Sequence, residues 1–90
     1  MVDYTFGVSD GTRLNNLHDL ARALEFMSEH TYKSHVNETK NDFSGWVHEV
    51  LGIEGLAVEL KDARNQFEAE ILVLEHILRI AKQRANQGHD

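Results

Sequence analysis

The fold is decided by the stretch Asn41-Asp42-Phe43-Ser44-Gly45-Trp46-Val47-His48-Glu49-Val50-Leu51-Gly52. Its apolar residues recur at intervals of three and four, which is the spacing of one buried face of an α-helix. They are Phe43, Trp46, Val47, Val50 and Leu51. Asn41 or Asp42 suits the N-cap, and Gly52 suits the position after the last turn. The stretch therefore predicts a helix over 42–51 that buries one face in a core.

Four further helices are expected around this one. Asn16 is an N-cap candidate with Asp19 three residues later, and the leucines that follow repeat at helical spacing over 16–27. Ser28 caps a short helix over 29–36, and Glu54 opens one over 54–61. The longest helix covers 63–85, and its apolar spacing stays in phase with 54–61. The pattern leaves open whether these last two helices are continuous.

The connecting segments complete the predicted fold. Ser9-Asp10-Gly11 is a turn signal between two short extended pieces and predicts a hairpin over about 4–14. The segment 37–41 is polar and is interpreted as a loop, and 86–90 is expected to be a frayed tail. We therefore expect residues 1–90 to form a single, mainly α, compact domain of four to five helices, with a small N-terminal β-hairpin and a long C-terminal helix.

Composition and charge exclude several classes of function. Nine Lys and Arg residues against fifteen Asp and Glu residues give a net charge of −6, which argues against nucleic-acid binding. The absence of cysteine removes disulfide scaffolds, thiol catalysis and Cys-ligated metals. Residues 1–4 lack a secretory pattern, and the longest apolar run, Ile71 to Leu74, is too short for a membrane span. We expect a cytoplasmic protein.

One segment carries a family resemblance. The stretch His35-Val36-Asn37-Glu38-Thr39-Lys40-Asn41-Asp42-Phe43-Ser44-Gly45-Trp46-Val47 resembles an "HVN…NDF..W(I/V)" motif of a small domain of unknown function found mainly in archaea. Phe6, Asp10-Gly11, the leucine-patterned helix and Leu56-Ala57 fit the same pattern, over roughly residues 4–80. Ile53-Glu54-Gly55 departs from it, because acidic residues are expected there. The resemblance implies a shared fold and brings no activity or catalytic residue with it.

The same motif gathers polar side chains that form a candidate site. They are His35, Asn37, Asn41 and Asp42. One interpretation is a small polar binding site at the junction of two helices. The favoured interpretation is structural: Asn37 ends one helix, Asn41 or Asp42 caps the next, and His35 hydrogen-bonds a loop carbonyl or a cap carboxylate.

Catalytic and metal-binding motifs are not found in the sequence. The six histidines lack metal-ligand spacing, since no Glu-x-x-His occurs and the position four after His48 is Gly52. His76 is expected to be solvated on the polar side of the last helix. No G-x-S-x-G or glycine-rich phosphate loop is present. We expect a protein that is not an enzyme and that has no cofactor.

The last helix has an apolar arc of roughly 180°, wider than an ordinary surface helix requires. Within it, alternating spacings of four and three form a coiled-coil-like seam. The seam residues are Phe67, Ile71, Leu74, Leu78, Ala81 and Ala85. Either this helix is central and covered on several sides, or part of the arc contacts a second copy of the chain. We favour the second alternative.

Together these patterns predict an assembly module. The expected function is non-enzymatic protein interaction and self-association through the long helix, with a further, unidentified protein partner. The residues expected at the interface are Leu72, Val73, Ile77 and Ile80. The alternative is a small-ligand or metal-binding regulatory domain that uses the His35–Asp42 junction.

Overall fold

The computed structural model describes residues 4–87, which form five helices and two β-hairpins. In chain order the elements are β1 (Phe6–Gly7), β2 (Arg13–Leu14), α1 (Leu17–Phe26), α2 (Glu29–His35), β3 (Val36–Asn37), β4 (Lys40–Asn41), α3 (Asp42–Glu49), α4 (Glu54–Lys61) and α5 (Gln66–Gln87). The predicted mainly α fold with an N-terminal hairpin and a long C-terminal helix is confirmed.

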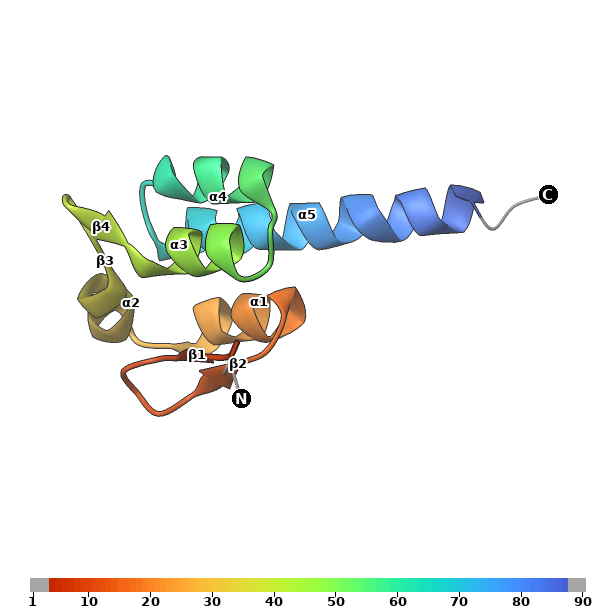
Figure 1. The fold of residues 1–90 in the computed structure, drawn as a ribbon. Helices are drawn as coiled ribbons and strands as arrows, with labels where there is room; N and C mark the ends of the chain where they lie inside the picture. Colours follow the sequence, from red (N-terminus) through yellow and green to blue (C-terminus); the bar gives the residue numbers. More distant parts are fainter. Residues whose placement is uncertain (1–3, 88–90) are drawn as a thin grey trace.

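Two helices, α1 and α4, pack against α5. Helix α3 packs against α4, and the β1–β2 hairpin lies against α1. Figure 1 shows that α5 then continues well past the other elements as a single projecting helix. The molecule is accordingly elongated, with extents of 47 × 35 × 22 Å.

The N-terminal hairpin forms where the Asp-Gly signal predicted it. Phe6 opposes Leu14 and Gly7 opposes Arg13 in an antiparallel register. Gly11 has a φ of 97°, a conformation that favours glycine, and the Asp10 carboxylate accepts a hydrogen bond from the Thr12 amide at 2.9 Å. The strands are only two residues long, so the hairpin depends on the helix that it packs against.

Side-chain caps set the starts of four helices. Asn16, Ser28 and Asn41 each accept a hydrogen bond from the backbone amide three residues later, as their positions predicted. Asn65 does the same for α5, accepting from the Glu68 amide at 2.8 Å. Helices α4 and α5 are therefore separate, and α5 starts three residues later than the predicted 63. At its other end α5 runs through Gln87, so 86–87 are helical, and 88–90 lie outside the described residues.

The segment 37–41 is not a plain loop, which corrects the sequence interpretation. Val36 opposes Asn41 and Asn37 opposes Lys40, so β3 and β4 form a second tight hairpin. The Asn37 side-chain oxygen accepts hydrogen bonds from the Thr39 amide and hydroxyl at 2.9 and 2.8 Å. These bonds close the turn. Because β3 begins at Val36, α2 ends at His35, one residue before the predicted end.

One contiguous core joins the helices and the first hairpin. From the α3 stripe it takes Phe43, Trp46 and Val47, as predicted. Val50 is an exception, since α3 ends at Glu49 and the Val50 side chain is 38% exposed. Gly52 has a φ of 69°, the left-handed conformation expected just after a helix.

Two polar side chains, one buried and one half-buried, connect neighbouring helices. The Ser44 hydroxyl, fully buried, donates to the Ala57 carbonyl of α4 at 2.6 Å. The Gln66 amide donates to the carbonyls of Leu24 and Met27 at 2.8 Å each, and so satisfies the C-terminal end of α1 from the start of α5. Each such bond fixes the position of one helix against another.

One glycine inside α3 and one just after it make a matched pair for a stability test. Gly45 lies inside α3, is exposed, and has open space where a Cβ would be. We expect Gly45→Ala to raise the free energy of unfolding by about 0.5–1 kcal/mol in urea denaturation. Gly52→Ala, at positive φ, should lower it by about 1 kcal/mol. The same sign for both substitutions would contradict the α3 boundaries.

Candidate functional site

His35 lies at the centre of the predicted polar cluster and is 9% exposed. Its Nε2 accepts a hydrogen bond from the Ser9 amide at 2.9 Å. Because an amide can only donate, Nε2 is unprotonated in this contact, and Nδ1 carries the proton and donates to the Asp42 carboxylate at 3.0 Å. The ring also contacts Phe6 and Phe43 with centroid distances of 5.3 and 5.2 Å. Both ring nitrogens are therefore engaged in bonds that hold the first hairpin to α2 and α3.

Asp42 receives two hydrogen bonds at the start of α3. His35 donates to its Oδ2, and so does the Lys40 ammonium at 3.1 Å. Burial raises the pKa of Asp42, but the bonds from His35 and Lys40 together outweigh it and hold the pKa below the ordinary value of 3.8. A carboxylate that stays ionised in this way suits a structural ion pair and the N-terminus of a helix.

The two asparagines of the cluster also have structural roles. Asn41 caps α3, and its amide donates to the Leu60 carbonyl at the end of α4 at 3.1 Å. Asn37 does not end α2, as the sequence predicted, because α2 stops at His35; its side chain closes the β3–β4 turn through its bonds from Thr39. The structure thus brings His35, Asp42 and Asn41 together at the start of α3. Their contacts favour the structural interpretation. The bond from Ser9 could not be read from the sequence.

The histidines do not gather into a metal-binding cluster. Within residues 4–87 no group of three or more His, Asp or Glu side chains is placed to hold a metal ion. His76 differs from its expected solvated position: it is half-buried, and its Nδ1 is buried with no hydrogen-bond partner. It lies on the side of α5 that carries the buried Ala69 and Val73, and not on a polar side.

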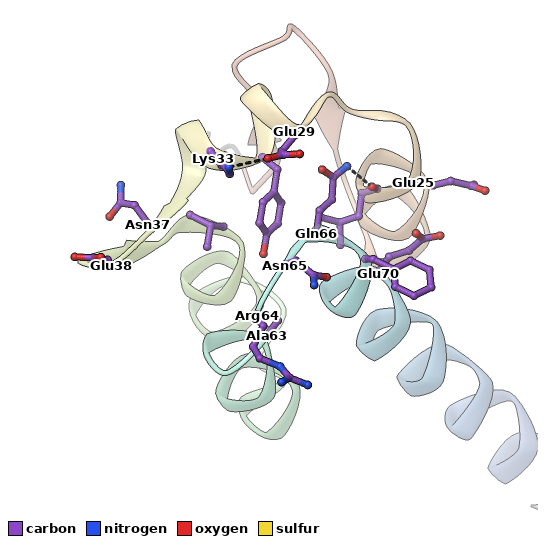
Figure 2. A pocket seen from close by; sticks show the side chains of 14 residues that line it. Glu25, Glu29, Lys33, Asn37, Glu38, Ala63, Arg64, Asn65, Gln66 and Glu70 are labelled. Atoms are coloured by element: carbon purple, nitrogen blue, oxygen red, sulfur yellow. Dashed lines mark hydrogen bonds and ion pairs between the residues drawn. The ribbon is translucent and has the colours of Figure 1, made fainter.

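A cleft of about 790 Å³ lies between the α1–α2 corner and the α4–α5 connection (Figure 2). Its lining cations are already engaged, since Lys33 pairs with Glu29 at 2.7 Å and Arg64 pairs with Glu68 at 3.1 Å. Tyr32 also lines the cleft, and burial raises the pKa of its hydroxyl. The residues that line this cleft therefore present no unpaired cation to an anionic ligand.

Helix α5 carries two apolar faces that point in different directions. The inner face packs against the core and consists of Ala69, Leu72, Val73 and Ile77. The outer stripe is the seam of alternating four and three spacing, and its members are Phe67, Ile71, Leu74, Leu78, Ala81 and Ala85. At 100° per residue these six positions fall within about 40° of one direction, whereas Val73 points roughly 120° away from it. The wide apolar arc that the sequence predicted for this helix therefore combines residues of both faces.

This arrangement corrects the predicted interface. Val73 is fully buried inside the chain and cannot reach a partner, and Leu72 and Ile77 are half-buried against the core. Ile80 is half-buried as well. The exposed residues are instead those of the outer stripe, where Phe67 is 68% and Leu78 is 55% exposed. Sequence alone could not separate the two faces, because both are apolar.

Comparison with known proteins adds no further assignment. No protein-family model, curated protein or solved structure matches this chain. The resemblance of the central motif to the archaeal domain therefore remains a prediction. Among the described residues, none of the helices combines the length and apolar character that a membrane crossing needs.

The Asp42 contacts predict a pH-dependent contribution to stability. Because the folded pKa of Asp42 is lowered, its contribution is present above pH 3.8 and is lost as the pH falls through the folded pKa. We expect Asp42→Asn to cost about 1 kcal/mol of unfolding free energy at pH 6, and this difference from the unmodified chain to shrink toward pH 3. Urea denaturation at a series of pH values measures it. A difference that stays constant with pH would contradict the ionised role of Asp42.

Proposed function

We propose that this chain is a non-enzymatic assembly module that associates with a second copy of itself through the outer stripe of α5. The observation that carries the proposal is the exposure of Phe67, Ile71, Leu74 and Leu78 along one line of one helix. Scattered exposed hydrophobic residues are ordinary in a folded protein, but a continuous row of them is typical of an interaction surface.

The alignment of these side chains distinguishes them from the other exposed hydrophobic residues. In the described part of the chain, eight large hydrophobic side chains are exposed, and four of them belong to the outer stripe. Fully burying an exposed Leu or Ile side chain contributes about 1.5–3 kcal/mol, and covering the part of Ile71, Leu74 and Leu78 that is still exposed contributes a fraction of that for each. Both copies bring the same residues, so a symmetric contact uses the stripe twice.

The projecting part of α5 gives a second, independent argument. After Ile80 every described side chain up to Asn86 is exposed, and Figure 1 shows no other element beside this part of the helix. In proteins most helical stability comes from tertiary packing of one face of the helix rather than from intrinsic propensity. A second copy lying along the projecting part supplies that packing.

The contacts of His35 do not favour the alternative of a ligand- or metal-binding regulatory domain at the His35–Asp42 junction. A ligand or metal would have to displace the Ser9 amide from Nε2 or the Asp42 carboxylate from Nδ1. Either displacement breaks a contact between the first hairpin, α2 and α3.

A double substitution tests self-association directly. We expect Leu74→Glu with Leu78→Glu to raise the dimer dissociation constant by on the order of a hundredfold or more, because four carboxylates would enter the interface. Size-exclusion chromatography with light scattering measures the change in mass, and circular dichroism should show the helical content retained.

The matched control is Val58→Glu on α4. Val58 is 56% exposed, nearly the same as Leu78, but it lies on a different helix. The control should leave the mass of the assembly unchanged. An unchanged mass for the double variant, or equal dissociation by the control, would count against the outer stripe.

A further inference from the structure

We propose that the two copies pack their α5 helices antiparallel. The projecting part of each α5 then covers the N-terminal part of the outer stripe on the other copy, where α5 lies beside α1 and α4. This inference rests on the proposed self-association and adds its orientation. Three features of α5 support it: the sizes of the stripe residues, the order of the charges along the helix, and the packing of α1 and α4 beside only one half of the helix.

The stripe residues decrease in size along the helix. Phe67, Ile71, Leu74 and Leu78 are large, whereas Ala81 and Ala85 are small. In an antiparallel pair with its twofold axis at the level of residue 76, each residue of one copy faces the partner's residue that lies equally far from residue 76 in the opposite direction. The layers are then Phe67 against the partner's Ala85, Ile71 against the partner's Ala81, and Leu74 against the partner's Leu78.

Each of these layers contains a combination of sizes that fills space. A parallel pair would instead place Phe67 against Phe67 at one end and Ala85 against Ala85 at the other. That arrangement crowds one end of the seam and leaves a gap at the other, and both defects reduce stability. The size order therefore favours the antiparallel arrangement.

The charges of α5 follow the same order. The first half carries only acids and the second half only bases among its charged residues: Glu68, Glu70 and Glu75, then Arg79, Lys82 and Arg84. The helix dipole favours such a distribution only within the first and last turns, so it does not explain Glu75 and Arg79 in the middle.

In the antiparallel arrangement each acid meets a base of the other copy. With the twofold axis at residue 76, each acid lies within two residues of the position directly opposite a base. The pairs are Glu68 with the partner's Lys82, Glu70 with the partner's Arg84, and Glu75 with the partner's Arg79. A parallel pair would align acids with acids and bases with bases, and like charges side by side are destabilising.

The third feature is that the other helices pack beside only one half of α5. Helices α1 and α4 pack beside the N-terminal half of α5, and the C-terminal half projects beyond them (Figure 1). In a parallel pair the two projecting halves, with their alanines, would contact only each other. The antiparallel pair puts helices α1 to α4 of the two copies at opposite ends of the α5 pair. Each projecting half of α5 then lies on Phe67 and Ile71 of the other copy.

Single cysteine variants test the orientation, since the chain has no cysteine of its own. Ile71→Cys and Ala81→Cys are made separately, one with an affinity tag, and mixed in a thiol–disulfide redox buffer. Antiparallel packing predicts a disulfide between the two different variants. Each variant alone should not cross-link, because ten residues along the axis separate identical positions by about 15 Å, beyond disulfide reach.

The possible results separate the two proposals. Cross-linking of Ile71→Cys with itself, and of Ala81→Cys with itself, would show a parallel pair and overturn the orientation while keeping self-association. A dimer by light scattering with no cross-link in any combination would overturn the seam as the interface. A chain that stays monomeric at every concentration would overturn the proposed function itself.

Charge reversal gives an independent test, because the two orientations predict opposite changes in the dimer dissociation constant. We expect Glu70→Lys to raise the dimer dissociation constant about tenfold, because two symmetry-related attractions become repulsions. Adding Arg84→Glu should restore it. In a parallel pair Glu70 would lie near the partner's Glu75, so Glu70→Lys would tighten the dimer instead. Gln83→Lys, outside the seam on the same helix, is the control and should leave the dissociation constant unchanged.

Discussion

The packing of the inner face of α5 against α1 and α4 determines the orientation of the whole helix. Ala69 and Val73, both buried, are small, so the neighbouring helices can approach the α5 backbone closely. Gln66 adds a directional contact, because its amide satisfies two carbonyls at the end of α1. With its inner face fixed in this way, α5 must present Phe67, Ile71, Leu74 and Leu78 to the outside.

The polar side chains of the central motif support the same packing from the other end of the molecule. Asn41 begins α3 and also reaches the end of α4, while Ser44 connects α3 to α4 from inside the core. His35 holds the first hairpin through Ser9 and the start of α3 through Asp42. The polar side chains of this motif therefore connect neighbouring structural elements, and the function that we propose uses a different surface, the outer stripe of α5.

Much of the fold follows from local sequence signals. The N-caps Asn16, Ser28 and Asn41 and the Asp10-Gly11 turn act within a few residues, so they could be predicted directly. The β3–β4 hairpin could not, because its strands are only two residues long and its Glu38-Thr39 turn lacks the Asp-Gly signal that marks the first hairpin. The orientation of α5 could not be predicted either: Val73 and Leu74 are adjacent apolar residues, and only the positions of α1 and α4 decide which is buried. The candidate polar site was found in sequence, but the bond from Ser9 joins residues 26 positions apart and needed the structure.

The central claim is that α5 has one face for its own core and one for a second copy. The most direct measurement is the solution mass of the unmodified chain by size-exclusion chromatography with light scattering, followed over a hundredfold dilution. We predict a mass of twice 10.3 kDa at the higher concentrations, with dissociation on dilution set by a single dimer constant. A mass of 10.3 kDa at every concentration would contradict the account, because the outer stripe would then remain exposed in the protein's stable state.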